Sequence, residues 1–237
     1  MGGLADNRMG GWRSGWRALA GLAVFLSAYP SIRLSAQVGH DPAHSPYRDV
    51  LRGPMVRVTT GYFSGTRGRI PVSPSDGPTG GLRFEYPMSN LLTIAAGVAY
   101  AQTDAFFFDP NDSVPQAKGP INNDLMLFDL GLQASLTGAK TFHGFQPYVG
   151  ASLGLVFGSA FASDTSGYSF GTKLSYGPEL GIRWHPTRRL SFEAGYRVLF
   201  YKLRYPFSYR PKLLPLGESL TQLTAHPWAM FGIGWTF

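Results

Sequence analysis

Bulky apolar side chains alternate with small or charged ones in segments of about ten residues along the sequence after residue 53. The clearest segment is 189–201, where every second residue from Leu190 to Phe200 is apolar and the residues between them include Glu193 and Arg197. A period of two places the two sets on opposite faces of a β-strand. The same alternation predicts eight strands, at 55–64, 80–87, 91–101, 125–136, 145–157, 171–185, 189–201 and 227–237.

One face of these predicted strands is bulky and aromatic, and the other is small or charged. A soluble sandwich also has alternating strands, but this contrast between faces is typical of strands that cross a membrane with lipid outside. Charged residues make up only 15% of the chain, below the roughly 25% of a soluble domain. No apolar stretch after residue 53 approaches the ~18 residues of a helical span. We therefore predict an all-β, eight-stranded antiparallel up-and-down transmembrane β-barrel over 54–237.

Long and short connections alternate between the predicted strands. The long ones are 65–79, 102–123, 158–170 and 202–224, and the short ones are 87–90, 137–144 and 185–188. Bacterial outer-membrane barrels have long extracellular loops and short periplasmic turns. An even number of strands then places both termini in the periplasm. Closing the sheet also satisfies every backbone hydrogen-bonding group in lipid.

The first 36 residues have the three parts of a cleavable signal peptide. Arg8, Arg13 and Arg17 precede an apolar run at 18–28, and small residues follow up to Ala36. Cleavage is expected after Ala36, with Ala28 as the second choice, and a short anchor helix or buried helix is the alternative. Cleavage would remove four arginines and one aspartate, which lowers the formal charge from +7 to +4. The basicity is therefore poor evidence for a nucleic-acid partner, and none is expected.

Residues 37–53 are expected to form a flexible periplasmic N-terminal extension. His40, Asp41 and His44 lie in it, but they lack a further fixed ligand for a metal ion. The chain has no cysteine, which excludes a disulfide framework and a Cys nucleophile. No metal site, cofactor or catalytic residue is assigned.

The C-terminal segment carries a family resemblance. Phe231, Ile233, Trp235 and Phe237 alternate with small residues and end the chain. This segment resembles the C-terminal assembly signal of outer-membrane β-barrels, and the whole pattern resembles the small eight-stranded barrels such as outer-membrane proteins A and X and the opacity proteins. The resemblance implies insertion by the outer-membrane barrel-assembly machinery, escort by periplasmic chaperones, and a monomer surrounded by outer-membrane lipid and lipopolysaccharide. Because nothing follows the last strand, the peptidoglycan-binding domain of the protein A type is not expected.

The predicted inner face carries cations and anions in near balance. An eight-stranded barrel is only just wide enough for its side chains, so each unpaired charge inside would cost several kcal/mol. We expect a polar network that plugs the lumen, formed by Arg57, Arg83, Glu85, Asp129, Lys173, Glu179, Arg183, Glu193 and Arg197. A turn that pairs Gly181 with Glu193 would place Arg183 diagonal to Glu193 and Glu179 diagonal to Arg197. The alternative is a narrow, porin-like channel for small solutes whose charge pairs exchange partners.

A lipid-modifying enzyme is the third hypothesis, because some eight-stranded barrels are lipid A acyltransferases or deacylases. His226 is predicted at the extracellular rim, near Glu218, Ser219 and Thr221, but the His-x-Ser spacing of the deacylase type is missing. A solvated or interfacial histidine is the simpler interpretation. The leading hypothesis is therefore a non-enzymatic structural or surface-interaction protein that acts through its extracellular loops.

Two predicted loops stand out. Loop 202–224 combines several tyrosines with the cations Lys202, Arg204, Arg210 and Lys212. These cations could contact the phosphates of anionic lipid, or the loop could be solvated with its tyrosines at the membrane interface. In loop 102–123, three consecutive phenylalanines could extend the aromatic girdle or form a recognition patch. Asp109, Asn111 and Asp112 are too few ligands for a calcium site.

Overall fold

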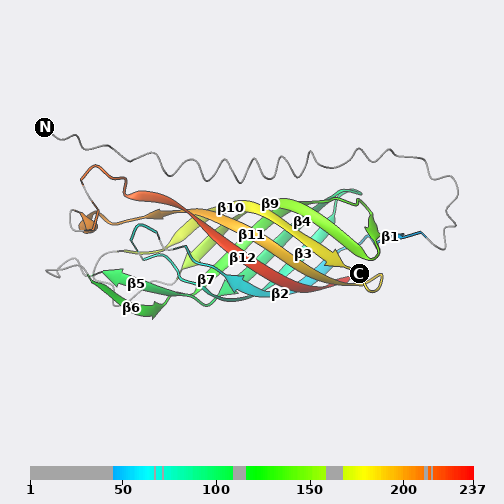
Figure 1. Ribbon diagram of the computed structural model, residues 1–237, viewed down its shortest axis with the longest axis horizontal. Helices are drawn as coiled ribbons and strands as arrows, with labels where there is room; N and C mark the ends of the chain where they lie inside the picture. Colours follow the sequence, from blue (N-terminus) through cyan, green and yellow to red (C-terminus); the bar gives the residue numbers. More distant parts are fainter. Residues whose placement is uncertain are drawn as a thin grey trace, which may run out of the picture. The chain divides into compact units, whose positions relative to one another are not determined.

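Eight antiparallel strands form one closed sheet (Figure 1). In the computed structural model they are β2 (Met55–Phe63), β3 (Gly77–Pro87), β4 (Leu92–Ala101), β7 (Leu125–Ser135), β9 (Phe145–Gly158), β10 (Thr172–Trp184), β11 (Leu190–Arg204) and β12 (Thr221–Thr236). Each strand pairs with the next in this order, and β12 pairs with β2 to close the barrel. The predicted eight-stranded antiparallel barrel is confirmed.

The structure describes residues 45–66, 68–70, 72–108, 116–158, 168–210, 213–214 and 216–237. The predicted signal peptide, the cluster of His40, Asp41 and His44, and the acidic run at 109–112 lie outside these residues. Within the described ranges, no helix has the length and hydropathy to span a bilayer.

The two ends of the barrel differ. Tight connections at 88–91, 136–144 and 185–189 lie at the end where β2 begins and β12 stops, which we name the short-turn end. The opposite end, where β2, β4, β9 and β11 finish, is the long-loop end.

The side chains follow the predicted inside–outside pattern. Phe192, Tyr196 and Trp235 are 38%, 42% and 47% exposed on the outer surface. Glu179 and Arg197 are 2% and 1% exposed in the interior. Tyr176 stacks on Phe200 near one edge of the outer face, and Trp184 stacks on Phe192 near the other. The eight residue-to-residue steps from Tyr176 to Trp184 cover about 27 Å along a strand, or roughly 20 Å of height at the tilt of membrane barrels.

The last two barrel strands extend beyond their predicted ends. Lys202 pairs with Leu223 and Arg204 with Thr221, so the predicted loop 202–224 shortens to 205–220. Here the alternation reverses in polarity: Lys202 and Arg204 point outward, whereas Leu203 is buried inside. Outward-facing charges indicate that this part of β11 lies outside lipid. Because its outer face is charged rather than apolar, the alternation of apolar residues does not predict a strand there.

Short elements occupy segments outside the eight predicted strands. β5 (Asp104–Phe108) and β6 (Ala117–Asn122) form a hairpin within the predicted loop 102–123. β1 (Tyr47–Asp49) pairs with β8 (Lys140–Phe142) at the short-turn end, and η2 (Phe207–Tyr209) is a single 3₁₀ turn. Within the predicted extension 37–53, the pairing of Tyr47–Asp49 with β8 and the bond from the Val50 N–H to the Ala139 carbonyl hold residues 47–50 against the barrel.

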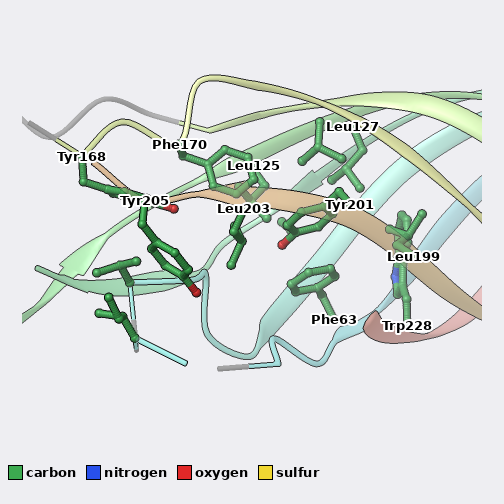
Figure 2. Close-up of a cluster of buried hydrophobic side chains, with 14 of the residues drawn as sticks. Phe63, Leu125, Leu127, Tyr168, Phe170, Leu199, Tyr201, Leu203, Tyr205 and Trp228 are labelled. Carbon is green, nitrogen blue, oxygen red and sulfur yellow. The ribbon is translucent and has the colours of Figure 1, made fainter. Parts of the chain in front are cut away.

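The barrel interior has an apolar half toward the long-loop end (Figure 2). This apolar cluster gathers buried side chains from six barrel strands and the long connections, including Phe63, Leu125, Leu127, Phe108, Tyr168, Phe170, Leu199, Tyr201, Leu203, Tyr205 and Trp228. Phe108 packs edge-on against Tyr209, so at least this phenylalanine of the triple-Phe run faces inward and does not extend the outer girdle. The remaining interior, toward the short-turn end, is charged.

Candidate functional site

Strand register brings opposite charges face to face inside the barrel. In the β10–β11 pair, Glu179 lies directly opposite Arg197, and Arg183 lies directly opposite Glu193. The predicted diagonal arrangement is wrong, because Gly181 pairs with Gly195 rather than with Glu193. The actual register shortens the distance that each side chain must cover.

The half of the charged region nearer the short-turn end contains Arg57, Glu85, Arg183 and Glu193. Arg57 forms ion pairs with both Glu85 and Glu193. The Nη2 atom of Arg183 lies 3.0 Å from Glu85 Oε2, and its Nε lies 2.9 Å from Glu193 Oε2. Each of the four side chains therefore contacts two opposite charges, and all four are buried.

The adjoining half contains Arg83, Asp129, Glu179 and Arg197. Glu179 accepts from Arg83 at 2.9 Å and from Arg197 at 2.8 Å. Arg197 also reaches Asp129 Oδ1 at 3.1 Å, and this carboxylate side chain is 9% exposed. Arg83 Nε, at 3.9 Å from Glu85 Oε1, connects the two halves.

These eight residues form one ion-pair network of four arginines and four carboxylates, with a formal charge of zero. It joins β2, β3, β7, β10 and β11 across the lumen. Gln133 adds a bridge, because its Nε2 donates to Glu179 Oε1 at 2.8 Å while its Oε1 accepts from Arg183. The ion pairs that every member makes offset the cost of burying eight charges, while the Nε atoms of Arg57, Arg83 and Arg197 have no hydrogen bond.

The ninth predicted member, Lys173, lies apart from this network. Its Nζ atom is 5.7 Å from the ring centroid of Phe170, and the side chain is half-buried near the long-loop end. Beyond the predicted set, Tyr148 and Trp228 each lie under an arginine, with Arg183 4.5 Å and Arg197 5.3 Å from the ring centroids. Both residues occupy inward-facing positions in the alternating segments. Because they are aromatic, the charge pattern of the inner face does not identify them.

His226 is not at a solvated rim. The imidazole is fully buried and stacks between Phe63 and Tyr201, with centroid distances of 5.4 and 4.2 Å. The backbone N–H of Thr66 donates to Nδ1 at 3.1 Å, so Nε2 carries the proton and donates to Thr224 Oγ1 at 2.8 Å. Both ring nitrogens are therefore occupied in the folded protein.

The other residues of the enzyme hypothesis have different neighbours. Glu218 pairs with Arg69 at 3.1 Å on the surface, and Ser219 bonds to Thr221 at 3.0 Å. The structure does not bring these groups to the buried His226. Among the described residues, no cluster of three or more histidine, aspartate or glutamate side chains could hold a metal ion.

The remaining predicted site residues lie on the outside. Lys202 and Arg204 are exposed on the outer face of β11, two and four residues beyond Phe200 of the aromatic pair. Arg210 donates to the carbonyl of Glu218, and Lys212 lies outside the described residues. Phe231, Ile233, Trp235 and Phe237 are exposed along the outer face of β12 and the end of the chain.

At the short-turn end, the segment before β2 crosses the barrel mouth. Val50 N–H donates to the Ala139 carbonyl at 3.1 Å, and Arg52 bonds to Asn90. Beneath this segment is a cavity of about 60 Å³ whose lining includes Glu85, Arg183 and His185. Burial, together with the charges of Arg183 and Arg57, lowers the pKa of His185 to about 4. This histidine is therefore neutral at pH 7.

Comparison with known proteins supports the fold. No family model matches the chain, and no curated protein matches it. Among solved structures, Neisserial surface protein A is 17% identical, with a TM-score of 0.50 over 78% of this chain and 97% of its own. The outer-membrane protein OprG of Pseudomonas aeruginosa is 16% identical, with a TM-score of 0.47 over 80% of this chain and 98% of its own. The predicted resemblance to the small eight-stranded outer-membrane barrels is thus confirmed at the level of the fold.

Proposed function

We propose that the protein is a plugged barrel of the outer membrane that acts through its surface rather than by conducting solutes or by catalysis. The outward apolar band between the Tyr176–Phe200 and Trp184–Phe192 pairs supports a lipid surround. The export-signal pattern of residues 1–36 and the alternating apolar row of Phe231, Ile233 and Trp235 support the outer membrane as its location. In this orientation, the short-turn end faces the periplasm and the long-loop end faces outward.

The ion-pair network is the observation that carries the plugged interior. Each guanidinium contacts carboxylates on a neighbouring or facing strand, so the charges neutralise one another and leave no single-sign path for an ion. The apolar cluster fills the interior toward the long-loop end, and moving a bare ion through tightly packed apolar side chains is costly. Both halves of the interior oppose conduction.

Planar-bilayer recording tests this function. We expect purified, heat-modifiable protein to give no steady conductance in symmetrical salt. Steady, uniform conductance steps would overturn the plugged interior and favour the narrow channel. Truncation of the chain before Val50 gives a matched preparation: we expect it to remain silent, because the ion-pair network itself, and not the segment at the mouth, closes the lumen.

The long-loop end offers the surface for the proposed role. Lys202 and Arg204 stand just beyond the aromatic girdle, where the phosphates of lipopolysaccharide lie in an outer leaflet. We expect K202Q/R204Q to bind immobilised lipopolysaccharide on the order of tenfold more weakly at low salt. The variant R69Q/K118Q removes the same charge elsewhere on this end and should bind like the wild type. Equal binding by all three proteins would contradict a contact between these two cations and lipopolysaccharide.

The outward residues of β12 support assembly by the barrel-assembly machinery. Phe231, Ile233, Trp235 and Phe237 form a continuous apolar row on the exposed outer face. We expect F237A to lower the yield of heat-modifiable protein in the outer membrane, while refolding in detergent is preserved. Loss of refolding in detergent would assign Phe237 a structural role instead.

A further inference from the structure

The short-turn end carries a strong excess of positive charge on its surface. Among the described residues of this end (46–54, 88–91, 136–144 and 185–189), the only acidic side chain is that of Asp49. The exposed basic side chains are Arg48, Arg52, Lys140, Arg188 and Arg189. Within the same part of the chain, no ion pair engages any of these five cations. This contrasts with the interior, where every arginine of the network has carboxylate partners.

Two of these cations border a polar cleft of about 460 Å³. The cleft forms because the β1–β8 pairing holds Arg48 on one side, while the β10–β11 turn holds Thr187 and Arg188 on the other. The rest of the lining consists of Tyr47, Asp49, Val50, Thr141, His185 and Pro186. Since burial lowers the pKa of His185 to about 4, the charge of the cleft at pH 7 comes from the two guanidinium groups and from Asp49.

The cleft begins where the apolar band ends. Trp184, which stacks on Phe192 at 5.6 Å, directly precedes His185 in the chain. Tyr47 and Phe142 form a second exposed ring pair at 5.5 Å across β1 and β8. Aromatic rings of this kind mark the interface of a bilayer, so the guanidinium groups of Arg48 and Arg188 lie at the depth of lipid phosphates.

We propose that this cleft binds the phosphate of an anionic phospholipid from the leaflet that surrounds the short-turn end. Guanidinium groups match the geometry of phosphate oxygens. The exposed hydroxyl of Thr187 accepts from the Leu190 N–H at 3.0 Å and keeps its own proton to donate. Arg52, Lys140 and Arg189 add a surrounding positive potential that attracts anionic lipid. The inference rests on the proposed membrane location, but not on the plugged lumen or on any role of the loops.

Native mass spectrometry of the full chain, released from mixed micelles of phosphatidylglycerol and phosphatidylcholine, tests the proposal. We expect wild-type protein to retain phosphatidylglycerol selectively and R48Q/R188Q to retain on the order of tenfold less. The matched variant R69Q/K118Q removes two cations at the opposite end and should retain the wild-type amount. Heat-modifiable mobility and insertion into liposomes, measured for all three, separate a failure of the barrel from a failure of the cleft.

Three results would overturn the proposal. R48Q/R188Q could retain as much phosphatidylglycerol as the wild type, or R69Q/K118Q could lose as much as R48Q/R188Q. Inorganic phosphate supplies the third arm: if it binds the cleft as tightly as the lipid does, the ligand is a free anion and the lipid assignment fails.

Discussion

Arg197 and Glu179 face each other across β10 and β11 inside the barrel, with Nη2 of the arginine 2.8 Å from Oε2 of the carboxylate. The same carboxylate accepts from Arg83 and from Gln133. Glu179 is thus the point where β3, β7, β10 and β11 meet, and the stability of the barrel should depend on its charge.

Neutralising Glu179 should destabilise the barrel strongly. E179Q leaves Arg83 and Arg197 buried with one carboxylate fewer, and removing one partner of a buried ion pair costs about 3–5 kcal/mol. The control E218Q breaks the exposed Arg69–Glu218 pair and should change the free energy of unfolding by less than about 1 kcal/mol. Urea unfolding of protein refolded into liposomes measures both. Equal effects of the two substitutions would show that the network contributes no more than a surface pair.

Glycines inside the barrel provide room for the long charged side chains. A Cβ atom at Gly232 would lie 2.6 Å from Cδ of Arg57, whereas a Cβ at Gly80 would have no atom within 4 Å. We expect G232A to destabilise by about 1–3 kcal/mol through overpacking, and G80A to be neutral or slightly stabilising. The same unfolding experiment compares them, and a neutral G232A would contradict a tightly packed Arg57.

His185 should make stability depend on pH. Its pKa in the folded barrel is about 4, below the ~6.5 of an exposed histidine. The unfolded chain therefore takes up the proton first, and stability falls as the pH drops from about 6.5 toward 4. Above pH 6.5 the neutral ring is present in both states and the effect vanishes.

The substitution H185Q isolates this contribution. It should reduce the loss of stability between pH 6.5 and 4. At pH 8 it should change the stability by a smaller amount. NMR titration of the ring reads the pKa directly, and a value near 6.5 in the folded protein would contradict the burial of His185.

The alternation of side chains was sufficient to predict the barrel because lipid imposes the same rule on every strand. Phe192 and Trp235 point outward and Glu179 and Arg197 inward, as the period of two requires. Register was not predictable to the residue, since Gly181 could pair with Glu193 or with Gly195 without changing any face. The turn conformation at 185–189 decides between them, and the alternation does not encode it.

The alternation fails where lipid ends. The part of β11 that carries Lys202 and Leu203 reverses its polarity, so the alternation predicts a loop there. His226 shares the inward parity of Trp228 and Met230, and that signal could have placed it inside. The three-residue strand β1 is too short to show a period, and its pairing with β8 depends on contacts between segments distant in the sequence.

Quenching of tryptophan fluorescence by brominated lipid tests most directly whether hydrocarbon lies outside the sheet. From residue 37 onward the only tryptophans are Trp184, Trp228 and Trp235. Single-tryptophan variants of protein that starts at residue 37, placed in liposomes, would retain either Trp235, 47% exposed on the outer face, or Trp228, 3% exposed in the interior. We expect strong quenching of Trp235 in W184F/W228F and little quenching of Trp228 in W184F/W235F. Strong quenching of Trp228 combined with a protected Trp235 would contradict it.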